Sequence, residues 1–305
     1  QACESHKMIP CGRWSRALHA AAEVCAIPHY GVGPQGAIAV AASLVASECL
    51  IVVNLSDNRL GPQGAGVIAT SLLHNSILRV LDLSKNGIGV DGCAALSQTI
   101  TQPDCALEEL DVSGNGLGDV GVTNLMSLAS SARPLRIRAL SLADNGVGLE
   151  GVRAIVRAAR DESGDACALK NLDLRWNNLT VAAAKVIAEG IILPRAAAAA
   201  STAQGEDGPP DAAAEDAERG KAPVPPATGL TDLDLSWNSL GDEGVTALAA
   251  AVPRAVGLQR LCLDHTGFRA QGAIALSAAI PLLAAGRGSR LLTLTLNNNA
   301  LGRAG

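Results

Sequence analysis

Apolar residues recur along the chain in a pattern that alternates between a short strand and a helix. In the stretch Leu78–Gly89 (LRVLDLSKNGIG), Leu81 and Leu83 fall on one face of an extended strand, because strand side chains alternate between faces. The stretch Gly244–Val252 (GVTALAAAV) has the apolar spacing of a helix that buries one side. The pattern predicts strand–turn–helix units, each with an apolar face that another unit must cover.

The strand pattern returns at a nearly constant spacing and ends each time in a polar anchor residue followed by a turn. The anchors Asn58, Asn86, Asn115, Asn145 and Asn177 are separated by 28, 29, 30 and 32 residues. Copies of the pattern occupy Leu50–Gly61, Leu78–Gly89, Leu107–Gly118, Ile137–Gly148, Leu169–Thr180, Leu230–Gly241, Leu258–Arg269 and Leu291–Gly302, and a weaker copy begins near Ala22. Such a period indicates a repeat architecture.

These repeats resemble the leucine-rich repeat family, specifically the long-repeat, ribonuclease-inhibitor-like subtype, over about residues 22–305. The resemblance implies an α/β solenoid, or horseshoe, with parallel strands on the concave face and helices on the convex face. One strand and one helix cannot bury their apolar faces alone, so neighbouring repeats must stack. We expect each anchor asparagine to hydrogen-bond the turn backbone of adjacent repeats, because buried backbone groups need partners.

The pattern divides the chain into a short N-terminal part and one long repeat domain. Residues 1–21 are predicted to be a helical segment that belongs to an earlier repeat or a cap, and residues 22–305 a domain of about nine repeats. Residues 194–229 are rich in Ala, Pro, Gly and acidic residues and nearly lack large apolar side chains. Such a composition predicts a disordered loop that interrupts the repeats. We expect the sequence to be a fragment of a longer protein.

Four GxGxxG motifs suggest a phosphate-binding loop at first sight. They start at Gly31, Gly87, Gly116 and Gly146, and each follows a predicted strand and opens a predicted helix. Because they recur with the period of the repeat, we interpret their glycines as part of the repeat's own turn. We therefore expect no nucleotide, no other cofactor and no metal. The sequence also lacks GxSxG and HExxH motifs, and its five histidines are scattered, so no catalytic set is predicted.

Charge and cysteine usage narrow the classes of partner and the compartment. The net charge of −5 argues against a nucleic-acid or anionic membrane partner. The eight cysteines include no CxxC pair, and we interpret them as mostly reduced, buried side chains. No stretch reaches the roughly 18 apolar residues that a membrane helix needs. These features predict a cytoplasmic monomer. Association with the cytoskeleton is an alternative within the same compartment.

The strand pattern also predicts which side chains line the concave face. The candidate protein-binding residues there are two tryptophans, one arginine and six aspartates: Trp176, Trp237, Arg175, Asp82, Asp111, Asp173, Asp232, Asp234 and Asp264. Two interpretations of the aspartates stay open, since they either solvate the sheet or form a docking surface for a basic partner. Trp176 and Trp237 occupy the same position of consecutive repeats and are expected to lie side by side. They are either a binding hot spot or a pair that packs on itself without a partner.

The leading functional hypothesis is a non-enzymatic scaffold whose concave face binds another protein. The resemblance leaves three alternatives open. The first is a GTPase-activating protein for a Ran-like GTPase, and the second is the sensing or regulatory part of an NLR-like receptor. The third is a cytoskeletal or axonemal structural subunit. GTP hydrolysis by Ran, measured with and without the chain, would separate the first from a scaffold.

Overall fold

The strands form a single parallel sheet that runs the length of the molecule. The computed structural model describes residues 12–129, 135–159, 168–192, 229–255, 257–285 and 290–301. Neighbouring strands follow one another in sequence order. The strands are β1 (Val24–Ala26), β2 (Val52–Asn54), β3 (Val80–Asp82), β4 (Glu109–Asp111), β5 (Ala139–Ser141), β6 (Asn171–Asp173), β7 (Asp232–Asp234), β8 (Arg260–Cys262) and β9 (Thr293–Thr295).

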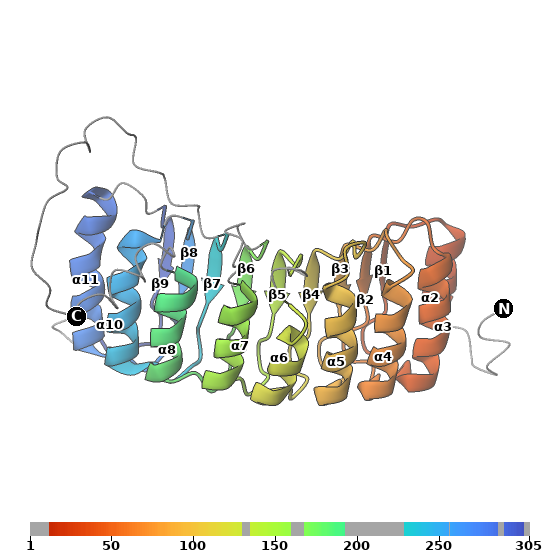
Figure 1. Ribbon diagram of the computed structural model, residues 1–305, viewed down its shortest axis with the longest axis horizontal. Helices are drawn as coiled ribbons and strands as arrows, with labels where there is room; N and C mark the ends of the chain where they lie inside the picture. Colours follow the sequence, from red (N-terminus) through yellow and green to blue (C-terminus); the bar gives the residue numbers. More distant parts are fainter. Residues whose placement is uncertain are drawn as a thin grey trace, which may run out of the picture.

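The helices form a second layer along one face of this sheet (Figure 1). They are α2 (Gly12–His19), α3 (Gly33–Ala46), α4 (Gly61–Leu72), α5 (Gly89–Ile100), α6 (Gly118–Met126), α7 (Leu149–Ala159), α8 (Val181–Ile187), α10 (Gly241–Ala251) and α11 (Ala270–Ala285). A π-helix, η1 (Ala188–Ile192), extends α8, and a 3₁₀ helix, η2 (Val252–Arg254), follows α10. Each helix carries the chain from one strand to the next parallel strand.

A continuous apolar core lies between the two layers. The central residue of each strand from β2 to β8, such as Leu81 in β3 or Leu233 in β7, is at most 2% exposed. The residue two positions later, such as Leu83 or Leu235, is fully buried. Burying one leucine stabilises the fold by about 1.5–3 kcal/mol. Because every repeat adds such leucines to the same core, stacking of repeats holds the molecule together.

The anchor asparagines form a hydrogen-bonded ladder along the turns that follow the strands. The side-chain amide of Asn86 donates to the carbonyls of Leu55 and Leu83, both at 2.9 Å. Its Oδ1 accepts the backbone N–H of Asn58 at 2.9 Å, and Oδ1 of Asn115 accepts that of Asn86 at 2.8 Å. The predicted role of these asparagines is confirmed. Thr266 takes the anchor position after β8, and its hydroxyl donates to the carbonyl of Leu263 at 2.9 Å and to Oδ1 of Asn299 at 3.4 Å.

The glycines of the GxGxxG motifs belong to the repeat's turn, as predicted. In the motif that begins at Gly87, both Gly87 and Gly89 have left-handed backbone (φ 62° and 63°), which glycine adopts without steric cost. The third glycine, Gly92, lies in α5, where an added Cβ would stand 2.2 Å from Cγ2 of Ile88 and 3.1 Å from Cβ of Ala65. The glycines therefore serve a tight turn and close packing of helix on helix.

Two helices start against an aspartate of the preceding repeat. Oδ1 of Asp119, in α6, accepts the N–H groups of Gly148 and Gly151 at 2.6 and 2.9 Å. Oδ1 of Asp242, in α10, accepts those of Arg269 and Gly272 at 2.8 and 2.7 Å. The first N–H groups of a helix have no partner inside it, so these contacts cap α7 and α11 from the neighbouring repeat.

The predicted α/β solenoid with one strand face and one helix face is thus confirmed. The N-terminal segment contains α2, whose Trp14 side chain is buried and packs on the core. The predicted loop 194–229 lies, except for its last residue, outside the described residues. The domain boundaries at residues 21 and 22 remain a prediction.

Candidate functional site

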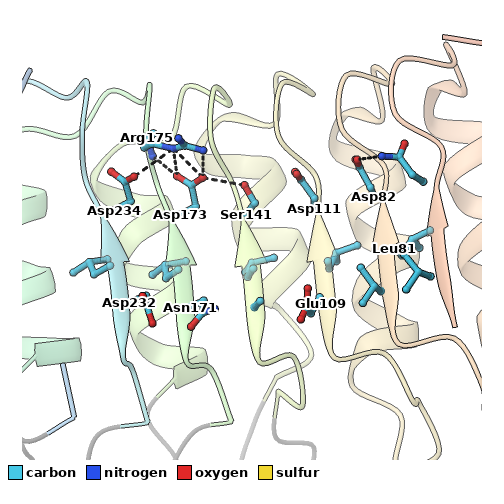
Figure 2. Close-up of a pocket in the computed structure, with 18 of the residues that line it drawn as sticks. Leu81, Asp82, Glu109, Asp111, Ser141, Asn171, Asp173, Arg175, Asp232 and Asp234 are labelled. Atoms are coloured by element: carbon cyan, nitrogen blue, oxygen red, sulfur yellow. Dashed lines mark hydrogen bonds and ion pairs between the residues drawn. The ribbon is translucent and has the colours of Figure 1, made fainter. Parts of the chain in front are cut away.

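The face of the sheet that points away from the helices is hollowed. A depression of ≈ 570 Å³ extends from β2 to β8 and is lined by strand side chains (Figure 2). We call this surface the strand face. Six of the nine predicted site residues line the depression: Asp82, Asp111, Asp173, Arg175, Asp232 and Asp234. Trp176, Trp237 and Asp264 lie beyond this lining.

Four of the aspartates share one row across the sheet, which we call the carboxylate row: Asp82, Asp111, Asp173 and Asp234. The sheet register pairs Asp82 with Asp111, and Asp173 with Asp234. Ser141 of β5 stands between the two pairs and interrupts the row. The structure therefore divides the predicted acidic stripe into two parts, one on β3 and β4 and the other on β6 and β7.

Each carboxylate in the row also stabilises the turn that follows its strand. Oδ1 of Asp111 accepts the backbone N–H of Ser113 at 2.8 Å and also the Ser113 hydroxyl, and Asp82 and Asp234 accept the N–H of Ser84 and Ser236, both at 2.9 Å. Asn54 of β2 makes the same contact with Ser56 through an amide oxygen. The turn therefore accepts an uncharged side-chain oxygen at this position and does not need the negative charge.

Burial makes the charge on two of these carboxylates unfavourable. The pKa of Asp111 is raised above its ordinary value, chiefly by burial and further by the neighbouring charges of Asp82 and Asp173, while the hydrogen bonds from Ser113 oppose the shift. Burial also raises the pKa of Asp234, with the bonds from Ser236 and the charge of Arg175 acting against it. The row thus carries charge that the fold itself does not favour.

The two parts of the row differ in how their charge is compensated. Arg175 donates to Asp173 from Nη2 at 2.7 Å and stands 3.5 Å from Oδ2 of Asp234 (Figure 2). Arg260 and Asp232, the first residues of β8 and β7, also form an ion pair on this face, with Nη1 of Arg260 2.9 Å from Oδ1 of Asp232. Within the described residues, no ion pair reaches Asp82 or Asp111. The carboxylates of the row that have no ion pair therefore lie on β3 and β4, where Asp82 accepts a hydrogen bond from Nδ2 of Asn54 at 2.7 Å.

The remaining predicted carboxylate, Asp264, lies after β8 and bonds toward β9. Its Oδ2 accepts the hydroxyl of Thr295 at 3.0 Å, and its Oδ1 accepts the backbone N–H of Asn297 at 2.5 Å. These contacts join Asp264 to the next repeat and leave it outside the carboxylate row.

The two predicted tryptophans do lie side by side. The ring centroids of Trp176 and Trp237 are 3.9 Å apart and their planes differ by 10°. His265, at the equivalent position of the following repeat, stacks on the other face of Trp237 with centroids 3.5 Å apart. We call these three side chains the aromatic stack. His265 was not among the predicted site residues, although alignment of the repeats places it in the same position as the tryptophans.

The position that carries the stack has an unusual backbone conformation. It precedes the anchor residue, and in every repeat from Asp57 onward its φ lies between 52° and 65°: Asp57, Lys85, Gly114, Asp144, Trp176, Trp237, His265 and Asn298. Left-handed backbone favours glycine, asparagine and aspartate and disfavours bulky side chains. A tryptophan at this position therefore adds backbone strain, and stacking of the aromatic rings offsets part of the free energy of that strain.

A row of valines, which the sequence analysis did not single out, lies at the N-terminal end of the strand face. Val24, Val52 and Val80 are paired in register on β1, β2 and β3. Val24 is 58% exposed, and the other two are partly exposed. The alternation of strand side chains was the signal that could have found them. This apolar row runs beside Asp82, so the face combines apolar and acidic contact surface there.

The remaining histidines and cysteines of the described residues lie apart from the strand face or do not form a cluster. No group of three or more His, Cys, Asp or Glu in this part of the chain is arranged to hold a metal ion. His29 hydrogen-bonds Asp57 at 2.6 Å, and His74 lies in the turn after α4. Cys49, Cys93, Cys105 and Cys262 are free thiols, and burial raises the pKa of Cys93 to about 12. None of the helices that the structure describes has the length and apolar character needed to cross a membrane.

Comparisons with known proteins identify the repeat. The family described as Leucine Rich repeat matches residues 46–69, 74–97, 105–126, 137–156 and 228–249. A search of curated proteins found no significant match. Among solved structures, the crystal structure of a TLR13–ssRNA13 complex matches at 14% identity with a TM-score of 0.36. The match covers 87% of this chain but only 31% of that one.

At that identity and TM-score, nothing about the partners of this chain follows from the TLR13 complex. The family matches, by contrast, coincide with five of the strand–turn–helix units described above. The chain therefore contains leucine-rich repeats, and its fold is a leucine-rich repeat solenoid.

Proposed function

We propose that the strand face binds a protein partner through a basic patch of that partner, and that the chain acts as a scaffold without catalysis of its own. Leucine-rich repeats commonly serve in protein–protein interaction, because stacked repeats present an extended curved surface. The observation that carries the proposal is the carboxylate row. The turn beside it needs only an oxygen, as Asn54 shows, yet four strands supply a carboxylate.

The charge of the row has a physical cost and a physical use. Burial disfavours the ionised form of Asp111 and Asp234, so keeping these two side chains charged has a cost in the folded protein. A basic partner would supply the missing counter-charge, and charge complementarity speeds and orients docking. We place one part of the binding surface on β1 to β4, where Asp82 and Asp111 have no ion pair and Val24, Val52 and Val80 add apolar area. We place a second part at the aromatic stack.

We also place this role in the cytoplasm, because Cys49, Cys93, Cys105 and Cys262 are free thiols. No described residue favours GTPase activation or receptor sensing over simple binding. We propose that the partner contacts the residues of the strand face and of the aromatic stack.

Binding should be tested with charge-neutral variants that keep the turn intact. We expect basic proteins retained by the immobilised wild-type chain at low salt to be lost with Asp82→Asn/Asp111→Asn, because Asn54 shows that asparagine fits this position. The matched control is Asp91→Asn/Glu150→Gln, which removes the same charge from exposed positions on the helices α5 and α7. Equal retention by all three proteins would contradict the proposal.

A further inference from the structure

We propose that the open face of the Trp176 indole binds an arginine side chain of the partner, with the carboxylate of Asp144 as its counter-charge. This inference rests on the proposed function and names the anchor within it. Trp237 covers one face of Trp176, and His265 covers the far face of Trp237. Trp176 therefore ends the stack, and its second face points toward the preceding repeat. Accordingly, Trp176 is 52% exposed and Trp237 39%.

The preceding repeat leaves room above that face. The outward side chains of β5 and of the residue just after Leu142 are Ala139, Ser141 and Ala143, all small, and Ala139 and Ser141 line the depression of the strand face. Asp144 occupies the same turn position as Trp176, one repeat earlier. Its Oδ2 lies 3.7 Å from the place where a Cβ of Gly114 would stand, so the carboxylate leans toward Gly114. The carboxylate of Asp144 therefore leans away from Trp176, toward Lys85, whose Cγ lies 3.0 Å from the same point and which makes no ion pair with Asp144 among the described residues. A guanidinium laid on the free face of the indole would occupy the space between Trp176 and this carboxylate.

The charges around this space favour a cation. Among the described residues, no ion pair engages Asp144 or Asp111. Arg175 is the nearest base along the chain, but it already contacts two carboxylates, Asp173 at 2.7 Å and Asp234 at 3.5 Å. One guanidinium between two carboxylates leaves that group net negative, so it does not repel an incoming cation.

The geometry favours arginine over lysine. A guanidinium is planar, lies flat on an indole and presents several N–H groups in its plane, so it can stack on Trp176 and bond Asp144 together. An ammonium can make the charge contact but cannot stack. The strand face as a whole attracts either side chain through its carboxylates, whereas this site distinguishes them.

The test compares octa-arginine and octa-lysine peptides, which carry equal charge. We expect isothermal titration at low salt to show that the wild-type chain binds the arginine peptide about three- to tenfold more tightly, as a cation–π contact predicts. The arginine peptide should also change the tryptophan fluorescence, since Trp14 is buried and Trp176 is exposed. In Trp176→Asn, which suits a left-handed turn, the preference should disappear while lysine-peptide binding persists.

A matched pair of variants isolates the counter-charge. Asp144→Asn and Asp57→Asn remove the same charge from the same left-handed position, three repeats apart. Only Asp144→Asn should reduce the preference for the arginine peptide. Equal affinity for both peptides, unchanged in Trp176→Asn, would overturn the arginine site and leave the acidic docking face standing. If neither peptide binds the wild-type chain, the proposed function fails together with this inference.

Discussion

The indole of Trp176 lies flat on that of Trp237, with ring centroids 3.9 Å apart, although one follows β6 and the other β7. The repeat brings them together, because each precedes its anchor asparagine in a parallel register. Both have left-handed backbone, with φ of 55° and 58°. The pair is therefore a feature added to the repeat, and the repeat does not require it.

Replacing Trp237 by asparagine should change the stability of the fold very little. Relief of the left-handed conformation favours the variant by about 1–2 kcal/mol, and loss of stacking on Trp176 and His265 disfavours it by about 0.5–1.5 kcal/mol per pair. We expect the free energy of unfolding in urea to stay within about 1 kcal/mol of wild type. A loss well beyond about 3 kcal/mol would show that the stack is a structural element.

Replacing an anchor asparagine, unlike replacing Trp237, should destabilise the fold clearly. Asn86→Ala removes three donated bonds, to the carbonyls of Leu55, Leu83 and Ser84, and the acceptor for the N–H groups of Asn58 and Leu60. We expect it to lower the free energy of unfolding by about 2–4 kcal/mol, because each unpaired buried backbone group costs about 1–3 kcal/mol.

The converse change, Thr266→Asn, places an asparagine at the anchor position after β8 and should raise the free energy of unfolding by about 1 kcal/mol. Denaturation curves of both variants test this pair, and destabilisation by Thr266→Asn would contradict it.

Ionisation of Asp111 should make the folded protein less stable as pH rises. Because the folded pKa of Asp111 is raised, the folded state binds more protons than the unfolded state, and stability falls as pH rises through the unfolded and then the folded pKa. Asp111→Asn removes this penalty, so we expect the variant to be the more stable protein at pH 7. The difference should vanish in acid below the ordinary aspartate pKa. Thermal unfolding of both proteins across this range measures it, and a less stable variant at pH 7 would contradict the interpretation.

The stability that Asp242 provides by capping α11 should instead increase as pH rises. The backbone N–H groups of Gly272 and Arg269 hold its pKa below the ordinary 3.8. A lowered folded pKa contributes stability that is present above the unfolded pKa and is lost as pH falls through the folded pKa. Asp242→Asn should therefore unfold more easily than wild type at pH 7, with the gap closing below about pH 3.8. Asp91→Asn, which changes an exposed first-turn acid of α5, is the control and should show a smaller effect at pH 7.

Much of the fold and part of the candidate site could be read from local patterns. The alternation of Leu81 and Leu83, the recurring anchors and the glycine turns each reflect contacts that every repeat makes in the same way. Their period therefore predicted the sheet, the helix layer and the neighbouring tryptophans.

The charges of the strand face could not be read in the same way. Whether Arg175 compensates Asp173, Asp234 or neither depends on side-chain geometry between repeats, and the sequence places all three on one face without pairing them. The uncompensated pair, Asp82 and Asp111, became visible only through the distances. Likewise, the left-handed backbone under Trp176 and Trp237 comes from the turn's hydrogen bonds, which residue type alone does not reveal.

The sequence by itself determined the solenoid, because its period sets identical backbone contacts in each repeat and the apolar residues must stack to be buried. Only the tertiary structure decided which carboxylates remain unpaired and that Trp176 ends a stack with one face open. Those features depend on how side chains of different repeats meet across the sheet.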